Sequence, residues 1–423
     1  MLQKIIIKKL FNRFNYNINL DENGITILTG PNGYGKTTIL RIIKAFSTHD
    51  FLFFVALPFK EISFVLGNMS VFSIFKPKFS GLDLEMVIDG KKIVNITRNE
   101  LKRVIHGPIK HHIYFNRNHY EMKREPTLNG ELHEEIKSMD GINRKKVNFL
   151  IQNDLGNAKL LPTFYEVYYI DSQRLTKLKS TKRKGFEEAS EKQLVENISE
   201  YSNELKRHIF RAISTYSTKA TELDSSFPKR LFSEKSTIDK KEFKKQVDTI
   251  NVIQKILNKY KIIDIQVVKP SKFRDEDAKA LFVYVNDTLE KLSVFNELLE
   301  KLRLFEDLIN NGKFSFKTLV IDRDQGFNFF SEDHTPIALS DLSSGEKQQV
   351  ILTYELLFKT EKSSIVLIDE PELSLHVAWQ KEFINNLRLI QSINGFTSII
   401  ATHSPSIVDL KWELTRDLYE LQS

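Results

Sequence analysis

The sequence predicts an α/β fold with a mixed sheet, an antiparallel β-subdomain and an inserted helical lid. Residues 24–29, 365–368 and 397–402 are short apolar runs, and runs of this length are typical of buried strands. Between residues 186 and 312, apolar side chains instead recur at helical spacing. The strands that close the sheet therefore follow a long helical segment.

Length and pattern together predict three parts. A chain of 423 residues has room for two or three domains of roughly 100 to 200 residues each. We expect a first lobe over residues 1–175, a helical lid or short arm over 176–312 and a second lobe over 313–423. Residues 101–160 are polar with poor periodicity, which indicates a helical or irregular insertion in the first lobe.

Paired strand-like runs predict two hairpins. Residues 84–88 and 93–96 flank Asp89-Gly90, a dipeptide favoured in two-residue hairpin turns. Residues 317–321 and 326–330 flank a second turn, at residues 322–325. Further short strands are expected at residues 5–7, 18–20 and 165–171.

Three apolar stripes predict the helices of the lid. Each stripe implies a helix of about 20 to 30 residues, which at 1.5 Å per residue extends about 30 to 45 Å. Helices of this length form a compact lid or short arm. The stripes are Leu194, Ile198, Tyr201, Leu205, Ile209 and Ile213; Phe243, Val247, Ile250, Ile253 and Leu257; and Leu292, Phe295, Leu299 and Leu302.

Residues 30–37 match a phosphate-binding loop. Gly30-Pro31-Asn32-Gly33-Tyr34-Gly35-Lys36-Thr37 fits the pattern G-x-x-x-x-G-K-[ST] and joins a predicted strand to a predicted helix. Its glycines let backbone N–H groups turn toward phosphate, and the helix N-terminus adds a positive dipole. We expect Lys36 to reach the β- and γ-phosphates of ATP and Thr37 to ligate Mg²⁺.

Two adjacent carboxylates follow the apolar run 365–368. Parallel sheets bind ligands at the carboxyl ends of their strands. We expect Asp369 to hold Mg²⁺ through water and Glu370 to orient and polarise an attacking water. The alternative is a plain charge pair at the strand end, and the upstream Lys36 argues against it.

Two further motifs lie near the end of the chain. Leu342-Ser343-Ser344-Gly345-Glu346 begins a helix, and either Ser343 or Ser344 is a candidate N-cap. In the functional interpretation, the Ser344 hydroxyl, the Gly345 amide and the helix dipole face a γ-phosphate. A lone histidine such as His403 is more often structural, but in this order of motifs we expect it to sense the γ-phosphate.

Together these motifs resemble the ABC ATPase superfamily. The resemblance implies an ABC-type P-loop ATPase head that hydrolyses ATP with Mg²⁺, in a head-to-tail dimer whose two sites are each completed by the signature of the other copy. Gln173 is the best candidate for the family's glutamine loop, and residues 373–376 take the place of its D-loop while departing from the transporter form. The implied nucleotide contacts are Asn32, Gly33, Gly35, Lys36, Thr37, Thr38, Gln173, Ser344, Gly345 and Glu346; the implied catalytic residues are Lys36, Glu370 and His403; and the implied metal contacts are Thr37, Asp369 and Gln173.

The spacing of the motifs selects a branch of the superfamily. A helical segment separates Lys36 from Ser344, which resembles the SMC/Rad50/RecF-like branch and argues against a transporter ATPase. The signature at residues 342–348 and the stretch at 369–376 are also similar to the ATPases of bacterial antiphage systems. Within that group the chain resembles the stand-alone ATPase subunits, PARIS-like ahead of Septu-like, or an OLD protein without its Toprim nuclease.

Composition narrows the protein class. The chain has no cysteine, which excludes disulfides and thiolate metal sites and agrees with a reducing cytoplasm. Neither a signal peptide nor an apolar run long enough to span a bilayer is evident, so we expect a protein without membrane contact. The net charge of +7 is consistent with a polyanionic partner such as nucleic acid, and equally with a general bias in the composition of the chain.

Two cationic stretches leave several interpretations open. The basic stretch 174–184 has three interpretations: a solvated linker, a contact to a nucleic-acid phosphate backbone, or a binding site for an acidic partner. The histidine-rich stretch 106–119 matches no standard metal-ligand spacing, so surface or partner contact is favoured. Nucleic acid and a viral trigger protein therefore remain candidate partners.

The predicted function is an ATP-driven switch. The chain is expected to be a cytoplasmic sensor subunit in antiphage defence that holds or releases a separate toxic effector, a nuclease, because no effector domain follows the last motif. The alternative is a RecF-like DNA repair or recombination ATPase that binds DNA.

Overall fold

A five-stranded parallel sheet forms the centre of the molecule in the computed structural model. The structure describes residues 2–21, 24–77, 83–106, 128–139, 141–154, 166–171, 186–264, 273–312, 314 and 316–422. All pairs of neighbouring strands in this sheet are parallel. Its strand order is β14 (Thr415–Asp417), β3 (Ile25–Thr29), β13 (Thr397–Ala401), β12 (Ile365–Asp369) and β8 (Val167–Ile170). The order confirms that strands from both ends of the chain build the α/β core.

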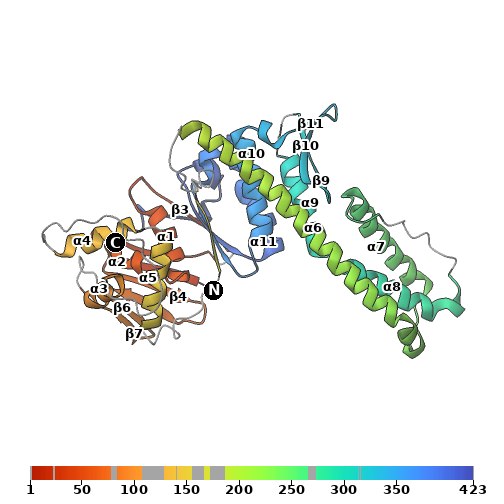
Figure 1. The fold of residues 1–423 in the computed structure, drawn as a ribbon, viewed down its shortest axis with the longest axis horizontal. Coiled ribbons are helices and arrows are strands. Elements are labelled where there is room, and N and C mark those ends of the chain that lie inside the picture. The colour runs from red at the N-terminus through yellow and green to blue at the C-terminus, as the bar shows by residue number, and fades with distance from the viewer. Residues whose placement is uncertain are drawn as a thin grey trace.

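A six-stranded antiparallel sheet lies beside this core and contains the first predicted hairpin (Figure 1). Asp89 and Gly90 connect its last two strands with φ angles of 46° and 80°, the sign that a two-residue hairpin turn requires. The strand order is β2 (Phe14–Asn19), β1 (Leu2–Leu10), β4 (Glu61–Leu66), β5 (Val71–Phe75), β6 (Leu84–Ile88) and β7 (Lys91–Ile96).

Helices cover this first part of the chain. Within the predicted insertion, all described residues except Met139 are helical, as one of its two interpretations expected. The helices are α1 (Lys36–Ser47), α2 (Phe51–Ala56), α3 (Arg98–His106), α4 (Leu128–Ser138) and α5 (Gly141–Asp154).

The parallel sheet separates two hydrophobic cores, because alternate residues of a strand point to opposite faces. Ile365 and Leu367 of β12 pack in the core that contains α1 and the antiparallel sheet. Val366 and Ile368 pack in the core that contains the lid helices and the second-lobe helices. Every residue of β12 is therefore buried, which explains the unbroken apolar run over its first four residues.

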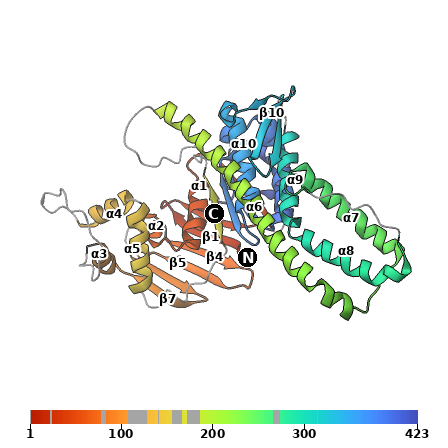
Figure 2. The same cartoon turned by 45° about the vertical axis from the view of Figure 1, so that its right-hand side comes forward.

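The lid is longer than its apolar stripe predicted. Helix α6 (Phe186–Ser233) has 48 residues, about 70 Å at 1.5 Å per residue, so the expected length of 20 to 30 residues is wrong for this helix. Its far end lies beside α8 (Ala278–Ser293), which also contacts α7 (Lys240–Lys259), and the three helices project from the core (Figure 2). The third stripe crosses from α8 into α9 (Asn296–Asn310), with Phe295 at the break.

The second lobe completes the fold. The predicted second hairpin is confirmed as β9 (Lys317–Asp322) and β10 (Gly326–Ser331), and β11 (Pro336–Ile337) extends it. The remaining elements are a 3₁₀ turn at Leu339–Asp341, α10 (Ser344–Tyr354), a π-helical turn at Glu355–Lys359, a 3₁₀ turn at Pro371–Ser374, α11 (Val377–Asn394), α12 (Pro405–Val408) and a 3₁₀ turn at Trp412–Leu414, with a further 3₁₀ turn at Asp275–Asp277 in the lid. No helix in the described part of the chain is long and apolar enough to cross a bilayer.

Candidate active site

The glycine-rich loop between β3 and α1 is shaped to receive an anion. Gly33 and Gly35 have φ angles of 83° and 88°, a backbone conformation that other residues rarely adopt. Helix α1 then begins without a side-chain cap and with no acidic residue in its first turn. The N–H groups and the positive dipole of the helix terminus are therefore directed at this loop.

Lys36 is held inside the loop. Its side chain is buried, and Nζ donates hydrogen bonds to the carbonyl oxygens of Gly30 and Pro31 at 2.7 Å and 3.2 Å. The same Nζ lies 3.4 Å from His403 Nδ1. Burial lowers the pKa of Lys36, while the surrounding carboxylates, Glu370 foremost, oppose this shift.

Thr37 and Asp369 form a pair of oxygen donors. Thr37 Oγ1 donates to Asp369 Oδ1 at 3.0 Å, and the Tyr169 hydroxyl donates to Oδ2 at 3.1 Å. Burial raises the pKa of Asp369, which is 3% exposed, and these two hydrogen bonds pull it back toward the ionised form. A hydroxyl beside a carboxylate suits Mg²⁺, which prefers oxygen ligands, so both residues fit a magnesium site.

Glu370 follows Asp369 in a left-handed backbone conformation. Its φ angle is 47°, which is strained for a residue with a side chain. The Glu370 N–H donates to the Ala401 carbonyl at 2.8 Å, so the neighbouring strand β13 helps to hold this geometry. The half-buried Glu370 carboxylate lies close enough to Lys36 to counter the effect of burial on the lysine.

His403 belongs to a loop that follows β13, and the carboxylate of Glu372 holds this loop. Glu372 Oε1 accepts from the His403 N–H at 2.7 Å, and Oε2 accepts from the Thr402 hydroxyl at 2.8 Å. Sequence reasoning assigned no role to Glu372 or to Tyr169. The only available signal for Glu372 was a third acidic residue two positions after Glu370.

The signature residues lie at the start of α10. Ser343 caps the helix, since its hydroxyl accepts from the Glu346 N–H at 3.3 Å. The Glu346 carboxylate accepts from the Ser343 N–H and pairs with Lys317 Nζ at 2.8 Å. Burial opposes ionisation of Glu346, but Lys317 and the Ser343 N–H hold its pKa below the usual value. Ser344 is left exposed in the first turn, so of the two N-cap candidates Ser343 is the cap.

The helices that follow the signature and the phosphate loop, α10 and α1, pack on opposite faces of the parallel sheet. The apolar side of α10 packs in one core and the apolar side of α1 packs in the other. Among the described residues, no hydrogen bond joins Ser344 or Gly345 to the loop. One copy of the chain therefore brings together Lys36, Thr37, Asp369, Glu370 and His403, but not the signature.

Several predicted residues have no described partner here. Asn32 and Gly33 are exposed in the loop, and Thr38 follows Thr37 in the first turn of α1. Gln173, the basic stretch 174–184 and residues 107–119 of the histidine-rich stretch lie outside the described residues. Within the described part of the chain, no cluster of three metal-ligating side chains occurs.

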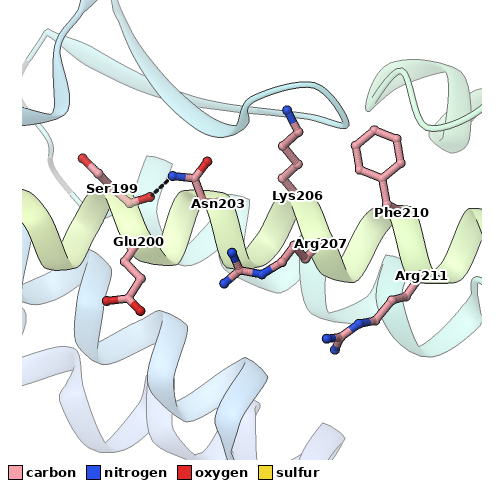
Figure 3. Close-up of a pocket in the computed structure, with 7 residues that line it drawn as sticks. All are labelled: Ser199, Glu200, Asn203, Lys206, Arg207, Phe210 and Arg211. Atoms are coloured by element: carbon pink, nitrogen blue, oxygen red, sulfur yellow. Dashed lines mark hydrogen bonds between the residues drawn. The ribbon is translucent and has the colours of Figure 1, made fainter.

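A second candidate surface lies on α6, away from the loop. It borders a shallow cavity of about 810 Å³, and Figure 3 shows Lys206, Arg207 and Arg211 projecting from this stretch of the helix. Lys206 Nζ lies 5.9 Å from the centre of the Phe210 ring. The full lining is Ser199, Glu200, Asn203, Lys206, Arg207, Phe210 and Arg211, which includes none of the predicted site residues.

Comparisons with known proteins give one family and a group of solved structures. Residues 1–408 match the family described as AAA ATPase domain. No curated protein shows significant similarity. The Smc head domain of Pyrococcus furiosus, solved bound to the C-terminal domain of ScpA, is 12% identical with a TM-score of 0.36, over 96% of this chain and 90% of that chain. The SMC head domain of Thermotoga maritima is 12% identical with a TM-score of 0.36, over 98% and 94%.

Proposed function

Because the chain belongs to the AAA ATPase domain family, we propose that its ATPase activity drives a switch between separate chains and a head-to-tail dimer. In the dimer, each ATP lies between the loop of one copy and Ser344 of the other. The observation that carries this proposal is the exposed signature, which lies across the sheet from the loop of its own chain. A second copy is the simplest source of the missing contact.

The geometry supports a role for each residue around the loop. Lys36 turns from the Gly30 and Pro31 carbonyls to the phosphate oxygens of ATP, and the backbone N–H groups of the loop bind the same phosphates. Thr37 and Asp369 hold Mg²⁺, which neutralises phosphate charge when bound.

Glu370 and His403 act where the γ-phosphate is attacked. Glu370 orients the attacking water and accepts its proton, since its carboxylate follows the carboxyl end of β12. His403 contacts the γ-phosphate, because its Nδ1 lies beside Lys36 Nζ. The Ser344 hydroxyl and Gly345 N–H of the second copy complete the enclosure of that phosphate.

A variant that binds ATP but hydrolyses it slowly tests the switch, because it should accumulate as the ATP-bound dimer. With ATP and Mg²⁺, Glu370→Gln is expected to elute at twice the 49.3 kDa of one chain and to hydrolyse ATP at least about 100-fold more slowly than the parent. The measurements are light scattering after size-exclusion chromatography and phosphate release. Adding Ser344→Arg at the exposed signature should return the trapped protein to single chains with ATP still bound.

Two results contradict the switch. Glu370→Gln that binds ATP and stays a single chain contradicts the composite site. Glu370→Gln that hydrolyses ATP at the parental rate contradicts the role of Glu370. Lys36→Ala, which removes the phosphate-binding cation, is the control for loss of ATP binding.

We further propose that this switch is a cytoplasmic sensor subunit in antiphage defence that holds or releases a nuclease. The support is the similarity of the motifs at residues 342–348 and 369–376 to the stand-alone ATPases of such systems. A RecF-like DNA-binding ATPase is the second candidate, because Arg207 and Arg211, one turn apart on α6, lie on the same side of the helix and line the cavity there (Figure 3).

Binding experiments separate these two candidates. Expression with the neighbouring genes should yield a complex with a nuclease that leaves when ATP is hydrolysed. The purified chain should bind duplex DNA only weakly. Tight DNA binding that falls steeply with salt, and that Arg207→Glu with Arg211→Glu abolishes, would instead establish the RecF-like function.

A further inference from the structure

Glu372 connects the two loops that carry the catalytic residues. Strands β12 and β13 are parallel neighbours, with Asp369 paired to Ala401. Their carboxyl ends therefore continue side by side, and the 3₁₀ turn Pro371–Ser374 places Glu372 next to the first two residues after β13. The connection could not be predicted from the sequence, since it depends on which strand lies beside β12.

Both oxygens of the Glu372 carboxylate are used. Oε1 accepts from the His403 N–H at 2.7 Å, and Oε2 accepts from the Thr402 hydroxyl at 2.8 Å. The Thr402 hydroxyl in turn accepts from the Ser404 N–H at 3.0 Å. A single carboxylate thus fixes the backbone on which the His403 ring is mounted.

Helix α11 holds Glu372 itself in place. Gln380 Nε2 donates to the carbonyl oxygens of Glu372 and Leu375 at 3.3 Å and 2.9 Å. Gln380 Oε1 accepts from the Ser404 hydroxyl at 2.7 Å. The two loops are therefore joined twice, once by Glu372 and once through Gln380, which makes a rigid frame around the histidine.

The charge of Glu372 also reaches the phosphate loop. Its carboxylate is among those that favour the protonated form of Lys36 against the effect of burial. Glu372 therefore lies near the 3.4 Å contact between Lys36 Nζ and His403 Nδ1 without making a bond to either side chain in the described structure.

We propose that Glu372 is a positioning residue for ATP hydrolysis that acts through His403. It holds the His403 backbone so that the ring stays beside Lys36, where the γ-phosphate is expected. The proposal rests on the function proposed above for His403. Because misplacing a catalytic group slows the chemical step more than it weakens binding, the effect belongs in kcat.

The first experiment compares kcat with ATP binding. Glu372→Ala is expected to lower kcat about 10- to 100-fold and to change the Kd for ATP less than about threefold. Glu372→Gln keeps one acceptor for the His403 N–H, so it should lose less than about tenfold in kcat. Glu382→Ala removes an exposed glutamate of α11 and is the matched control, with parental kcat.

The second experiment is a double-mutant cycle with His403→Ala. If Glu372 acts through His403, Glu372→Ala with His403→Ala is no slower than His403→Ala alone. A merely structural role would make the two losses add. Circular dichroism of each variant, with the same spectrum as the parent, shows that the fold is intact.

The outcomes distinguish this inference from the proposed function. Parental kcat in Glu372→Ala, equal losses in Glu372→Ala and Glu372→Gln, or additive losses in the cycle would overturn the positioning role alone. Parental kcat in His403→Ala would contradict the γ-phosphate contact of His403 and, with it, this inference.

Discussion

Lys76 is a buried cation that forms no ion pair with any described residue. The residue is 5% exposed, and its Nζ donates to the Val55 carbonyl at 2.7 Å. The same Nζ lies 5.4 Å from the centre of the Phe59 ring. Burial lowers the pKa of Lys76 from 10.5 to about 8. The folded protein therefore bears the cost of a buried charge at neutral pH.

Lys76→Met is expected to stabilise the protein at pH 7 by about 1–3 kcal/mol. Between pH 8 and 10.5 the unfolded parent holds a proton on Lys76 that the folded parent has lost, so parental stability rises with pH in this range. The advantage of the variant should shrink accordingly from pH 7 to pH 9.5, measured by urea unfolding. The control is Lys60→Met, at an exposed lysine, which should change stability by less than about 0.5 kcal/mol. A stability gain from Lys76→Met that is equal at pH 7 and pH 9.5 would contradict the lowered pKa of Lys76.

Single residues of the site differed in how far the sequence could predict them. Thr37 and Asp369 could be chosen from local spacing and lie in hydrogen-bond contact beside Lys36, while their roles toward ATP and Mg²⁺ stay predictions. Glu372 and Tyr169 could not be assigned, because the partners of Glu372 lie in the loop after β13 and the partner of Tyr169 lies on β12. A glutamate or a tyrosine carries no local mark that shows which loop it will contact.

Helices α6 and α8 are joined by an ion pair within the projecting lid. The Arg230 guanidinium makes a two-pronged contact with the Asp287 carboxylate, in which the second hydrogen bond is 2.7 Å, and Asp287 is 6% exposed. Arg230 also donates to the Leu223 carbonyl at 2.6 Å. Two-pronged arginine pairs are stronger than single surface pairs, so this contact fixes the register of the two helices.

Asp287→Asn should loosen the lid without affecting ATP binding. Amide hydrogen exchange in α6 and α8 is expected to show about 1–2 kcal/mol less protection, because one partner of a mostly buried pair loses its charge. Asp224→Asn is the matched control, since the exposed Asp224 pairs with Lys291 at 2.5 Å and should cost less than about 0.5 kcal/mol. Equal losses of exchange protection in the two variants would show that the Arg230–Asp287 pair stabilises the lid no more than an exposed ion pair does.

The type of each element was easier to predict than its length. The apolar stripe of α6 ends at Ile213, yet the helix continues to Ser233. The later residues form one side of the projecting lid, where many side chains of α6 are exposed and no broad apolar stripe is needed. Pro228 also lies inside the last turns of this helix, where a sequence pattern predicts an end.

At the scale of the whole molecule, the order of the strands in the central sheet could not be predicted from the sequence. Each strand of the central sheet could be expected from its apolar run, but β3 lies between β13 and β14, which come from the other end of the chain. Such pairing depends on tertiary packing, which a short window of sequence does not contain. The opposite placement of α1 and α10 follows from this packing and could be anticipated only from a family resemblance.

The position of β3 between β13 and β14 also determines when the central sheet can form during translation. Strands β1, β2, β4 and β5 pair with partners made within the first 75 residues, so the antiparallel sheet has its template early. Strand β3 waits for residues 397–401 and 415–417, which at about 5–20 residues per second means roughly 20 to 80 s on the ribosome. A chain interrupted before residue 365 has its phosphate loop but neither Asp369 nor His403. The residues around the phosphate loop can therefore come together only after β12 and β13 have been made, late in translation.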